Sequence, residues 1–196
     1  DRGGQRDVGL ARHRPENACR AKPALLPVTY APEEETVEAT EFLEERDFGN
    51  RDREALVSEL AQVLPRGALL MDAEDLRPYE CDGLTAYRQL PLAVALPESE
   101  DQVRAILRIC ASLGVPVVAR GAGTSLSGGA MPHKDGVLLS MAKFKRIVRI
   151  DPAARLAVVQ PGVRNLAITE AVAAHGLYYA PDPSSQIACS IGGNVA

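Results

Sequence analysis

The chain has 196 residues, which is enough for one main domain with a small appendage. Its apolar fraction of 46% and charged fraction of 24% are those of an ordinary globular protein, and a net charge of -4 offers nucleic acid no electrostatic attraction. Aromatic residues make up only 4% and tryptophan is absent, which argues against a protein that stacks single-stranded nucleic acid on aromatic side chains.

The cysteine count and the hydropathy pattern bear on where the protein resides. Four cysteines, Cys19, Cys81, Cys110 and Cys189, lie far apart, with no CxxC pair and no histidine at metal-ligand spacing. A reduced, cytoplasmic protein without a metal site is therefore expected. No apolar run approaches the roughly 18 residues of a membrane helix, and the start lacks the order of a secretory signal. Because the chain begins without methionine and stops shortly after a glycine pair, we expect a piece of a longer protein.

The first 50 residues carry no hydrophobic period. Residues 1–27 combine scattered arginines with prolines and are expected to form a loop or a disordered tail, whereas the acidic stretch 33–47 is expected to be a solvated charge run. We therefore interpret residues 1–50 as a disordered extension, residues 51–90 as a helical segment and residues 91–196 as part of the main domain.

Periodic hydrophobicity begins just after this extension. The stretch "DREALVSELAQVLPRG" (residues 52–67) places Leu56, Leu60 and Val63 on one helical face, and its proline and glycine end the helix. Residues 90–97, "LPLAVALP", form an apolar run between prolines, which predicts a buried strand.

A second helix leads from this strand to another. Residues 98–114 predict the helix, because Ser99 and Gln102 fit a capping box and the stretch ends in glycine. Its expected apolar stripe consists of Val103, Ile106, Leu107 and Cys110. Residues 115–119, "VPVVA", predict the next strand and complete a β-α-β unit.

Short strands and one helix make up the rest. Three strand candidates, at residues 136–141, 146–151 and 155–161, are separated by turn signals, among them Asp151-Pro152. An alanine-rich helix is expected over residues 163–175, ending at a glycine. A β-α-β unit followed by meandering strands and a helix predicts an α+β fold.

The loop "RGAGTSLSGG" (residues 120–129) has the composition of an anion-binding nest. Glycines remove Cβ atoms and reach positive φ, so that main-chain N–H groups can converge on an anion. The loop lacks the lysine of a Walker motif, and Leu126 replaces the last glycine of the dinucleotide fingerprint. Taken alone, it is either an anion-binding nest or an ordinary glycine-rich turn.

A second loop-like stretch, "YYAPDPSSQIACSIGGNVA" (residues 178–196), has no helical or strand period. Its apolar residues Ile187, Cys189 and Ile191 predict an interior location. Buried loops need partners for their polar main chain, so two such loops suggest an extended polar and aromatic ligand between them.

Together these segments carry a family resemblance. "PVVARGAGTSLSGGA" (116–130), "VQPGVRN" (159–165) and residues 178–196 resemble the N-terminal half of an FAD-binding domain of the p-cresol methylhydroxylase / vanillyl-alcohol oxidase type. The likeness runs from about residue 52 to residue 196 and includes "RPYECDGLTAYR" (77–88). Within the family it is closest to the flavin subunits of bacterial glycolate oxidases, which are kin to D-lactate and D-2-hydroxyglutarate dehydrogenases.

The resemblance implies FAD as the cofactor and assigns two groups of residues to it. The first loop would hold the FAD diphosphate through Arg120, Gly121, Ala122, Gly123, Thr124, Ser125, Leu126, Gly128 and Gly129. The second would line the ribityl and isoalloxazine region through Pro181, Asp182, Pro183, Ser185, Cys189, Ser190, Gly192, Gly193 and Asn194, supported by Pro161 and Gly162. Ala130 stands where some relatives have a histidine bonded to flavin, so non-covalent FAD is implied.

Several single residues carry expectations of their own. Cys189 is interpreted as a small residue packed near the flavin, with a redox-active thiol as the alternative. Tyr178 and Tyr179 are interpreted as pocket wall or core rather than as proton donors. We expect His133 to be exposed and His175 to interact with the dipole at a helix end.

The resemblance also implies an activity. It is FAD-dependent oxidation of a small 2-hydroxy acid, glycolate to glyoxylate or alternatively D-lactate, with electrons passing to companion subunits that include an iron–sulfur protein. These subunits would also provide any association with a membrane. The catalytic base and the substrate clamp are expected beyond this chain, which by itself would be inactive. The alternatives are a non-enzymatic nucleotide- or phosphate-binding module and a flavin oxidase of the same fold with another alcohol substrate.

Overall fold

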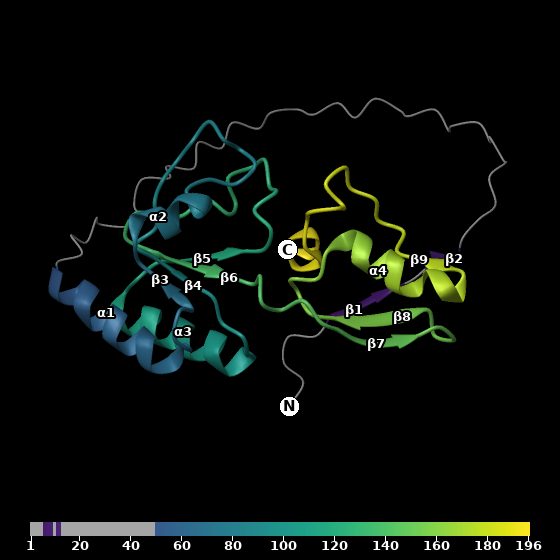
Figure 1. Cartoon of the computed structure of the whole chain (residues 1–196), viewed down its shortest axis with the longest axis horizontal. Helices are drawn as coiled ribbons and strands as arrows, with labels where there is room; N and C mark the ends of the chain where they lie inside the picture. The colour runs from purple at the N-terminus through teal and green to yellow at the C-terminus, as the bar shows by residue number, and fades with distance from the viewer. Residues whose placement is uncertain (1–5, 10, 13–49) are drawn as a thin grey trace, which may run out of the picture.

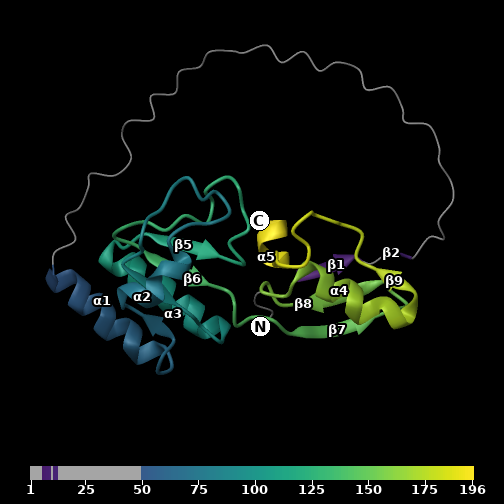
Figure 2. The ribbon, with the colours of Figure 1, turned by 45° about the horizontal axis from the view of Figure 1, so that its top comes forward.

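The computed structural model describes residues 6–9, 11–12 and 50–196 (Figure 1). It contains two lobes side by side, a helix-covered four-stranded sheet and a smaller lobe on a three-stranded sheet. Helix α5 (Ile191–Val195), at the C-terminus, lies between the two lobes (Figure 2). The α+β fold expected from the sequence is confirmed.

Two helices cover one face of the first sheet. Helix α1 (Asn50–Val63) and helix α3 (Glu100–Leu113) lie together below the sheet in Figure 1. Leu56 and Leu60 of α1 are fully buried, as their helical spacing predicts. They pack with Ile106 and Cys110 of α3 into one core, so residues that precede position 91 share the core of those that follow it.

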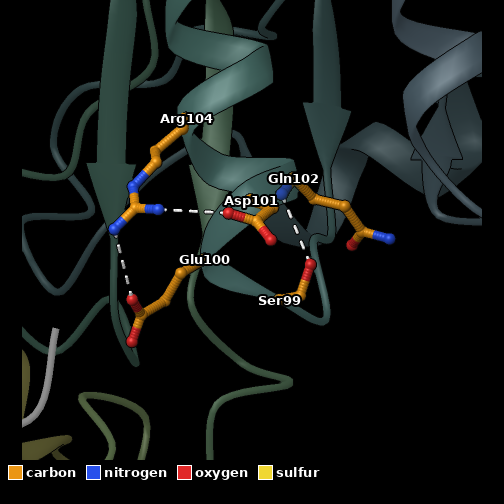
Figure 3. A network of polar contacts seen from close by, with 5 residues as sticks. All are labelled: Ser99, Glu100, Asp101, Gln102 and Arg104. Atoms are coloured by element: carbon orange, nitrogen blue, oxygen red, sulfur yellow. Dashed lines mark hydrogen bonds and ion pairs between the residues drawn. The ribbon is translucent and has the colours of Figure 1, made fainter. Parts of the chain in front are cut away.

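The N-terminus of α3 forms the cap expected from its sequence. The Gln102 N–H donates to Ser99 Oγ at 3.3 Å, and the Glu98 N–H donates to Gln102 Oε1 at 2.7 Å. Arg104 in the first turn pairs with Glu100 and Asp101 on the exposed side (Figure 3). The bond to Ser99 satisfies one of the N–H groups that a helix start leaves without intrahelical partners.

One residue of the predicted apolar stripe lies elsewhere. Leu107 is 44% exposed, whereas Ile109 packs against the core in its place. The prediction for Leu107 was wrong because the core of this lobe covers only part of the apolar arc of the helix. Cys110 is buried as expected, and burial raises the pKa of its thiol to about 11, so that it stays protonated at neutral pH.

The first sheet has the order β3-β4-β6-β5. Its strands are β3 (Leu69–Leu70), β4 (Ala93–Ala95), β5 (Val117–Arg120) and β6 (Val137–Ser140). Strands β4 and β5 flank α3 in the chain, but each pairs in parallel with β6, which lies between them. The sequence predicted β6 as part of a meander, and this was wrong: its four residues are all buried, which suits a central parallel strand covered on both faces.

The second face of this sheet is covered by a short helical segment. Helix α2 (Ala73–Leu76) leads into the 3-10 helix η1 (Arg77–Tyr79). Leu76 packs against Val94 and Leu138, the residues of β4 and β6 that point away from α1 and α3. The polypeptide after η1 continues toward the carboxyl ends of the parallel strands.

The second lobe is an antiparallel sheet under a helix. Strands β7 (Ile147–Asp151) and β8 (Leu156–Val159) form the predicted hairpin. Helix α4 (Asn165–Val172), η2 (Ala173–His175) and β9 (Leu177–Tyr178) follow. Ile168 and Val172 of α4 pack with Val159 in the core of this lobe.

Two strands lie where the sequence predicted a loop. Strand β1 (Arg6–Gly9) pairs with β8, and β2 (Ala11–Arg12) pairs with β9, both antiparallel. The prediction for these residues was wrong because pairing at an open sheet edge uses main-chain groups and needs no hydrophobic period. The acidic stretch 33–47 lies outside the described residues. No helix within the described part of the chain has the length and hydropathy needed to cross a membrane.

Burial on α3 can be tested with two neighbouring residues. Ile106→Ala is expected to lower the free energy of unfolding by about 2–4 kcal/mol, because it opens a cavity in the core. Leu107→Ala is expected to change it by less than about 1 kcal/mol, because this side chain is partly in water. Urea denaturation measures both, and equal losses for the two variants would contradict the packing described here.

Candidate functional site

The glycine-rich loop lies at the carboxyl edge of the parallel strands. It starts directly after β5, whose last residue, Arg120, pairs with Ser140 at the end of β6. Loops at this edge of an open α/β sheet commonly hold ligands, because the strands end there and leave a crevice. The position of the loop in the fold therefore favours ligand binding, independently of the residues that the loop contains.

Two glycines give the loop its shape. Gly123 and Gly128 have φ of 69° and 73°, a conformation that side-chain-bearing residues rarely adopt. Among the described residues, the main-chain N–H groups of Ala122, Gly123 and Thr124 donate no hydrogen bond to the protein. Free N–H groups in a glycine-rich bend are the donors that an anion requires.

The second loop is held by a buried asparagine. Asn165, 1% exposed at the start of α4, donates from Nδ2 to the Pro181 carbonyl at 3.0 Å. Its Oδ1 accepts from Asn194 Nδ2 at 3.1 Å, and its main-chain N–H donates to the Cys189 carbonyl at 3.0 Å. One side chain thus ties the beginning of the loop to its end.

Sequence analysis did not identify Asn165 as a site residue. The sequence did carry an indication, because an asparagine directly after "PGVR" at a helix start is polar and is not expected to form part of an apolar core. Its partners could not be inferred, since Pro181 and Asn194 lie 16 and 29 residues away in the chain.

The two loops touch at one serine. Ser190, 5% exposed, contacts the first loop at Gly121, where a Cβ atom would clash with Ser190 Oγ. Ser190 Oγ is buried and has no hydrogen-bond partner among the described residues. Such a hydroxyl is costly unless something else bonds to it, so it marks a place for a polar ligand atom.

Two cavities open on either side of this contact. One, of about 480 Å³, is lined by the glycine loop, Ser185 and the start of α5. The other, of about 420 Å³, is lined by the loop after β8, by α4 and by Lys145 and Arg164. Gly121, Ala122 and Ser190 line both cavities and form the ridge between them. No acidic residue lines either cavity, and Lys145 and Arg164 favour an anionic ligand at the smaller one.

About half of the predicted site residues line these cavities. Those that do are Gly121, Ala122, Gly123, Thr124, Ser125, Gly129, Gly162, Ser185, Ser190, Gly193 and Asn194. Those that do not are Arg120, Leu126, Gly128, Pro161, Pro181, Asp182, Pro183, Cys189 and Gly192. Among the residues that line neither cavity, Gly192 is explained by close packing, because a Cβ atom there would lie 2.7 Å from Pro161 Cβ.

The apolar residues of the second loop do not all face inward. Cys189 and Ile191 are buried as predicted, but Ile187 is 65% exposed, so the interior location predicted for it was wrong. The reason is that residues 185–188 form a turn that projects beyond the asparagine network. Cys189 Sγ accepts from Asn194 Nδ2 at 3.4 Å, and its burial favours the packing role over an accessible redox thiol.

The expectations for Tyr179 and His133 are confirmed by the structure. Tyr179 packs against the core of the second lobe, and burial raises the pKa of its hydroxyl above the usual value. His133 and His175 are both exposed. The described part of the chain holds no group of three or more histidine, cysteine, aspartate or glutamate residues that could bind a metal ion.

Comparison with known proteins identifies the context of this site. Residues 91–196 match the family described as "FAD binding domain". The glycolate oxidase subunit GlcD of Escherichia coli (strain K12) is 62% identical over 145 residues, which cover 74% of this chain and 29% of that subunit. The subunit of the same name from Bacillus subtilis (strain 168) is 42% identical over 117 residues, which cover 60% of this chain and 25% of that subunit.

The fold is also found among solved structures. The crystal structure of p-cresol methylhydroxylase with substrate bound has a TM-score of 0.58 at 23% sequence identity, covering 64% of this chain and 25% of that one. This likeness concerns the fold alone. The resemblance predicted from the sequence is confirmed, and the chain spans less than a third of the length of the two subunits it matches.

The asparagine network can be tested by its effect on stability. Asn165→Leu is expected to lower the free energy of unfolding by about 2–4 kcal/mol, because it leaves Asn194 and the Pro181 carbonyl without their partner. Gln89→Leu is the matched control, since its amide bonds to a carbonyl on the exposed surface. Denaturant unfolding measures both, and an Asn165 variant as stable as the control would contradict the network.

Proposed function

The chain belongs to the family of FAD-binding domains, and from this premise we propose that its two loops bind FAD non-covalently in a protein that oxidises a small 2-hydroxy acid. The ridge between the two cavities carries the proposal. FAD is an extended molecule with a diphosphate at its centre and a larger group at each end. Two cavities that share Gly121, Ala122 and Ser190 match this arrangement.

The residues on the ridge fit the diphosphate chemically. The free N–H groups of Ala122, Gly123 and Thr124 supply donors, and the buried Ser190 hydroxyl supplies another. Each hydrogen bond to a charged oxygen contributes roughly 1.5–3 kcal/mol, so a few of them anchor the cofactor. Lys145 and Arg164 add positive charge on one side.

The remaining predicted residues act as support in this proposal. Gly128 sets the shape of the first loop, and Pro181, Gly192 and Cys189 hold the second loop through the contacts described above. Leu126, Asp182 and Pro183 line neither cavity, and their proposed part in FAD binding has no further support in the contacts of this structure. Ala130, which lines the larger cavity, has no group that could bond covalently to flavin.

When bound, FAD supplies a hydride acceptor for alcohol oxidation. The part of this chain is to bind the cofactor and orient it between the lobes. We assign no catalytic base, and we propose that the substrate groups belong to the part of the relatives that this chain does not match. The 62% identity to a glycolate oxidase subunit supports glycolate as the substrate, with D-lactate as the alternative.

Because the two glycolate oxidase relatives reported above are named as subunits, we propose that the protein works in a complex. The family resemblance supports an iron–sulfur companion as the electron acceptor. It also supports a cytoplasmic location with contact to a membrane only through such companions.

Anaerobic reduction tests the proposed function. The purified full-length protein is expected to carry flavin absorbance that glycolate bleaches in the absence of oxygen. Bleaching by another alcohol alone would indicate a flavin oxidase of different specificity. A colourless protein that binds ATP and not FAD would contradict the proposal and favour a phosphate-binding module.

Ser190→Ala separates cofactor binding from stability. The variant is expected to raise the Kd for FAD roughly 10- to 100-fold, because a hydrogen bond to a charged oxygen is lost. The stability of the cofactor-free protein should not fall, since the hydroxyl has no protein partner there. Flavin fluorescence titration and thermal melting measure the two effects, with Ser112→Ala on α3 as the control. An unchanged FAD affinity would remove Ser190 from the site.

A further inference from the structure

The Arg120 side chain lies inside the glycine loop rather than in either cavity. Its Nη1 donates to the Ala130 carbonyl at 3.5 Å, so the arginine at the start of the loop contacts the residue at its end. Midway along the loop, a Cβ at Gly123 would lie 2.5 Å from Arg120 Cζ. The loop main chain therefore wraps around the guanidinium.

The same guanidinium fastens the loop to the segment before β4. Nη1 donates to the Cys81 carbonyl at 2.7 Å, and Cζ lies 5.7 Å from the centre of the Tyr79 ring. The contact is tight further along the loop as well, because a Cβ at Gly83 would lie 2.7 Å from the Ser125 carbonyl oxygen. The segment and the loop thus pack main chain against main chain around one arginine.

The segment that receives Arg120 is itself braced. The Gln89 N–H donates to the Glu80 carbonyl at 2.8 Å, and Arg88 pairs with the Glu80 carboxylate. The Leu84 N–H donates to Asp82 Oδ1 at 2.9 Å. These bonds link residues within the segment to one another, so that the segment supports the glycine loop.

Two buried charged residues lie in this region of the structure. Among residues whose side chains the structure describes, Asp82 and Arg120 are the buried charged ones, with 4% and 9% exposure. Asp82 directly follows Cys81, whose carbonyl Arg120 bonds, but among the described residues the two charged groups form no ion pair and Asp82 Oδ2 has no hydrogen-bond partner. A buried charge is costly unless neighbouring groups compensate it, and for Arg120 two carbonyls and the Tyr79 ring do so.

We infer that Arg120 is a positioning residue: it holds the glycine loop in its ligand-binding shape from inside, and it makes no contact with the cofactor. This inference rests on the proposed function and changes the role that the sequence implied for Arg120. A loop held in shape before binding loses little conformational entropy when the ligand arrives, which increases affinity. Arginine suits the task because its planar fork lets Nη1 donate to two carbonyls while its face lies over a ring, whereas lysine presents a point charge.

Arg120→Lys in the full-length protein tests the inference, because it keeps the charge and removes the fork. The variant is expected to raise the Kd for FAD at least about tenfold in a flavin fluorescence titration. In the cofactor-free protein, amide hydrogen exchange in residues 127–131, where the Ser127 and Met131 N–H groups are hydrogen-bonded, should become faster while that in α3 stays unchanged. Arg104→Lys, on the exposed side of α3, is the matched control and should change neither measurement.

A second pair of variants covers the case in which Arg120→Lys does not fold. Tyr79→Leu removes the ring and keeps the arginine, and it should speed exchange in residues 127–131, whereas Tyr79→Phe should restore the wild-type rate. Wild-type FAD affinity and exchange in Arg120→Lys, or in Tyr79→Leu where Arg120→Lys does not fold, would overturn the inference. A wild-type protein that binds no FAD would instead refute the proposed function, which keeps the two failures distinct.

Discussion

The close approach of the two loops at glycine residues is the constraint on which the site depends. Gly121 of the first loop meets Ser190 of the second, and Gly192 meets Pro161, at distances that leave no room for a Cβ atom. This contact joins the lobes where the parallel strands of one end and the last helix begins. It also divides the space between the lobes into two cavities with a common ridge. A Cβ atom at position 121 would displace the Ser190 hydroxyl from its place between the cavities.

One buried polar side chain holds each loop in shape, and this side chain does not lie on the surface of the loop that faces the ligand. Arg120 lies inside the first loop and bonds to Cys81 and Ala130, whereas Asn165 lies under the second and bonds to Pro181 and Asn194. Loops rich in glycine have few side chains with which to hold themselves, and folding must offset their high conformational entropy. In each loop, one residue that makes several hydrogen bonds fixes the conformation and leaves the main-chain N–H groups free for a ligand.

The same arrangement explains why one hydroxyl can remain unbonded. Ser190 is held by its neighbours in the contact, and its Oγ faces the ridge without a protein partner. An unsatisfied buried hydroxyl lowers the stability of the free protein, and a bound phosphate oxygen would remove that cost. Removal of the Ser190 hydroxyl is therefore expected to affect the stability of the cofactor-free protein and its affinity for FAD in different ways. This difference distinguishes a ligand contact from a packing contact.

Local sequence determined much of this protein. The helical spacing of Leu56 and Leu60, the Ser99 cap and the glycine loop were all readable, because each depends on residues close together in the chain. Tertiary structure alone decided that β6 separates β4 from β5, that β1 pairs with β8, and that Leu107 and Ile187 face solvent. It also decided that Arg120 turns away from the cavities, since its partner Cys81 lies 39 residues earlier in the chain. Periodicity and composition indicate the local structure that a residue favours, whereas these outcomes depend on which segment, distant in the sequence, packs beside it.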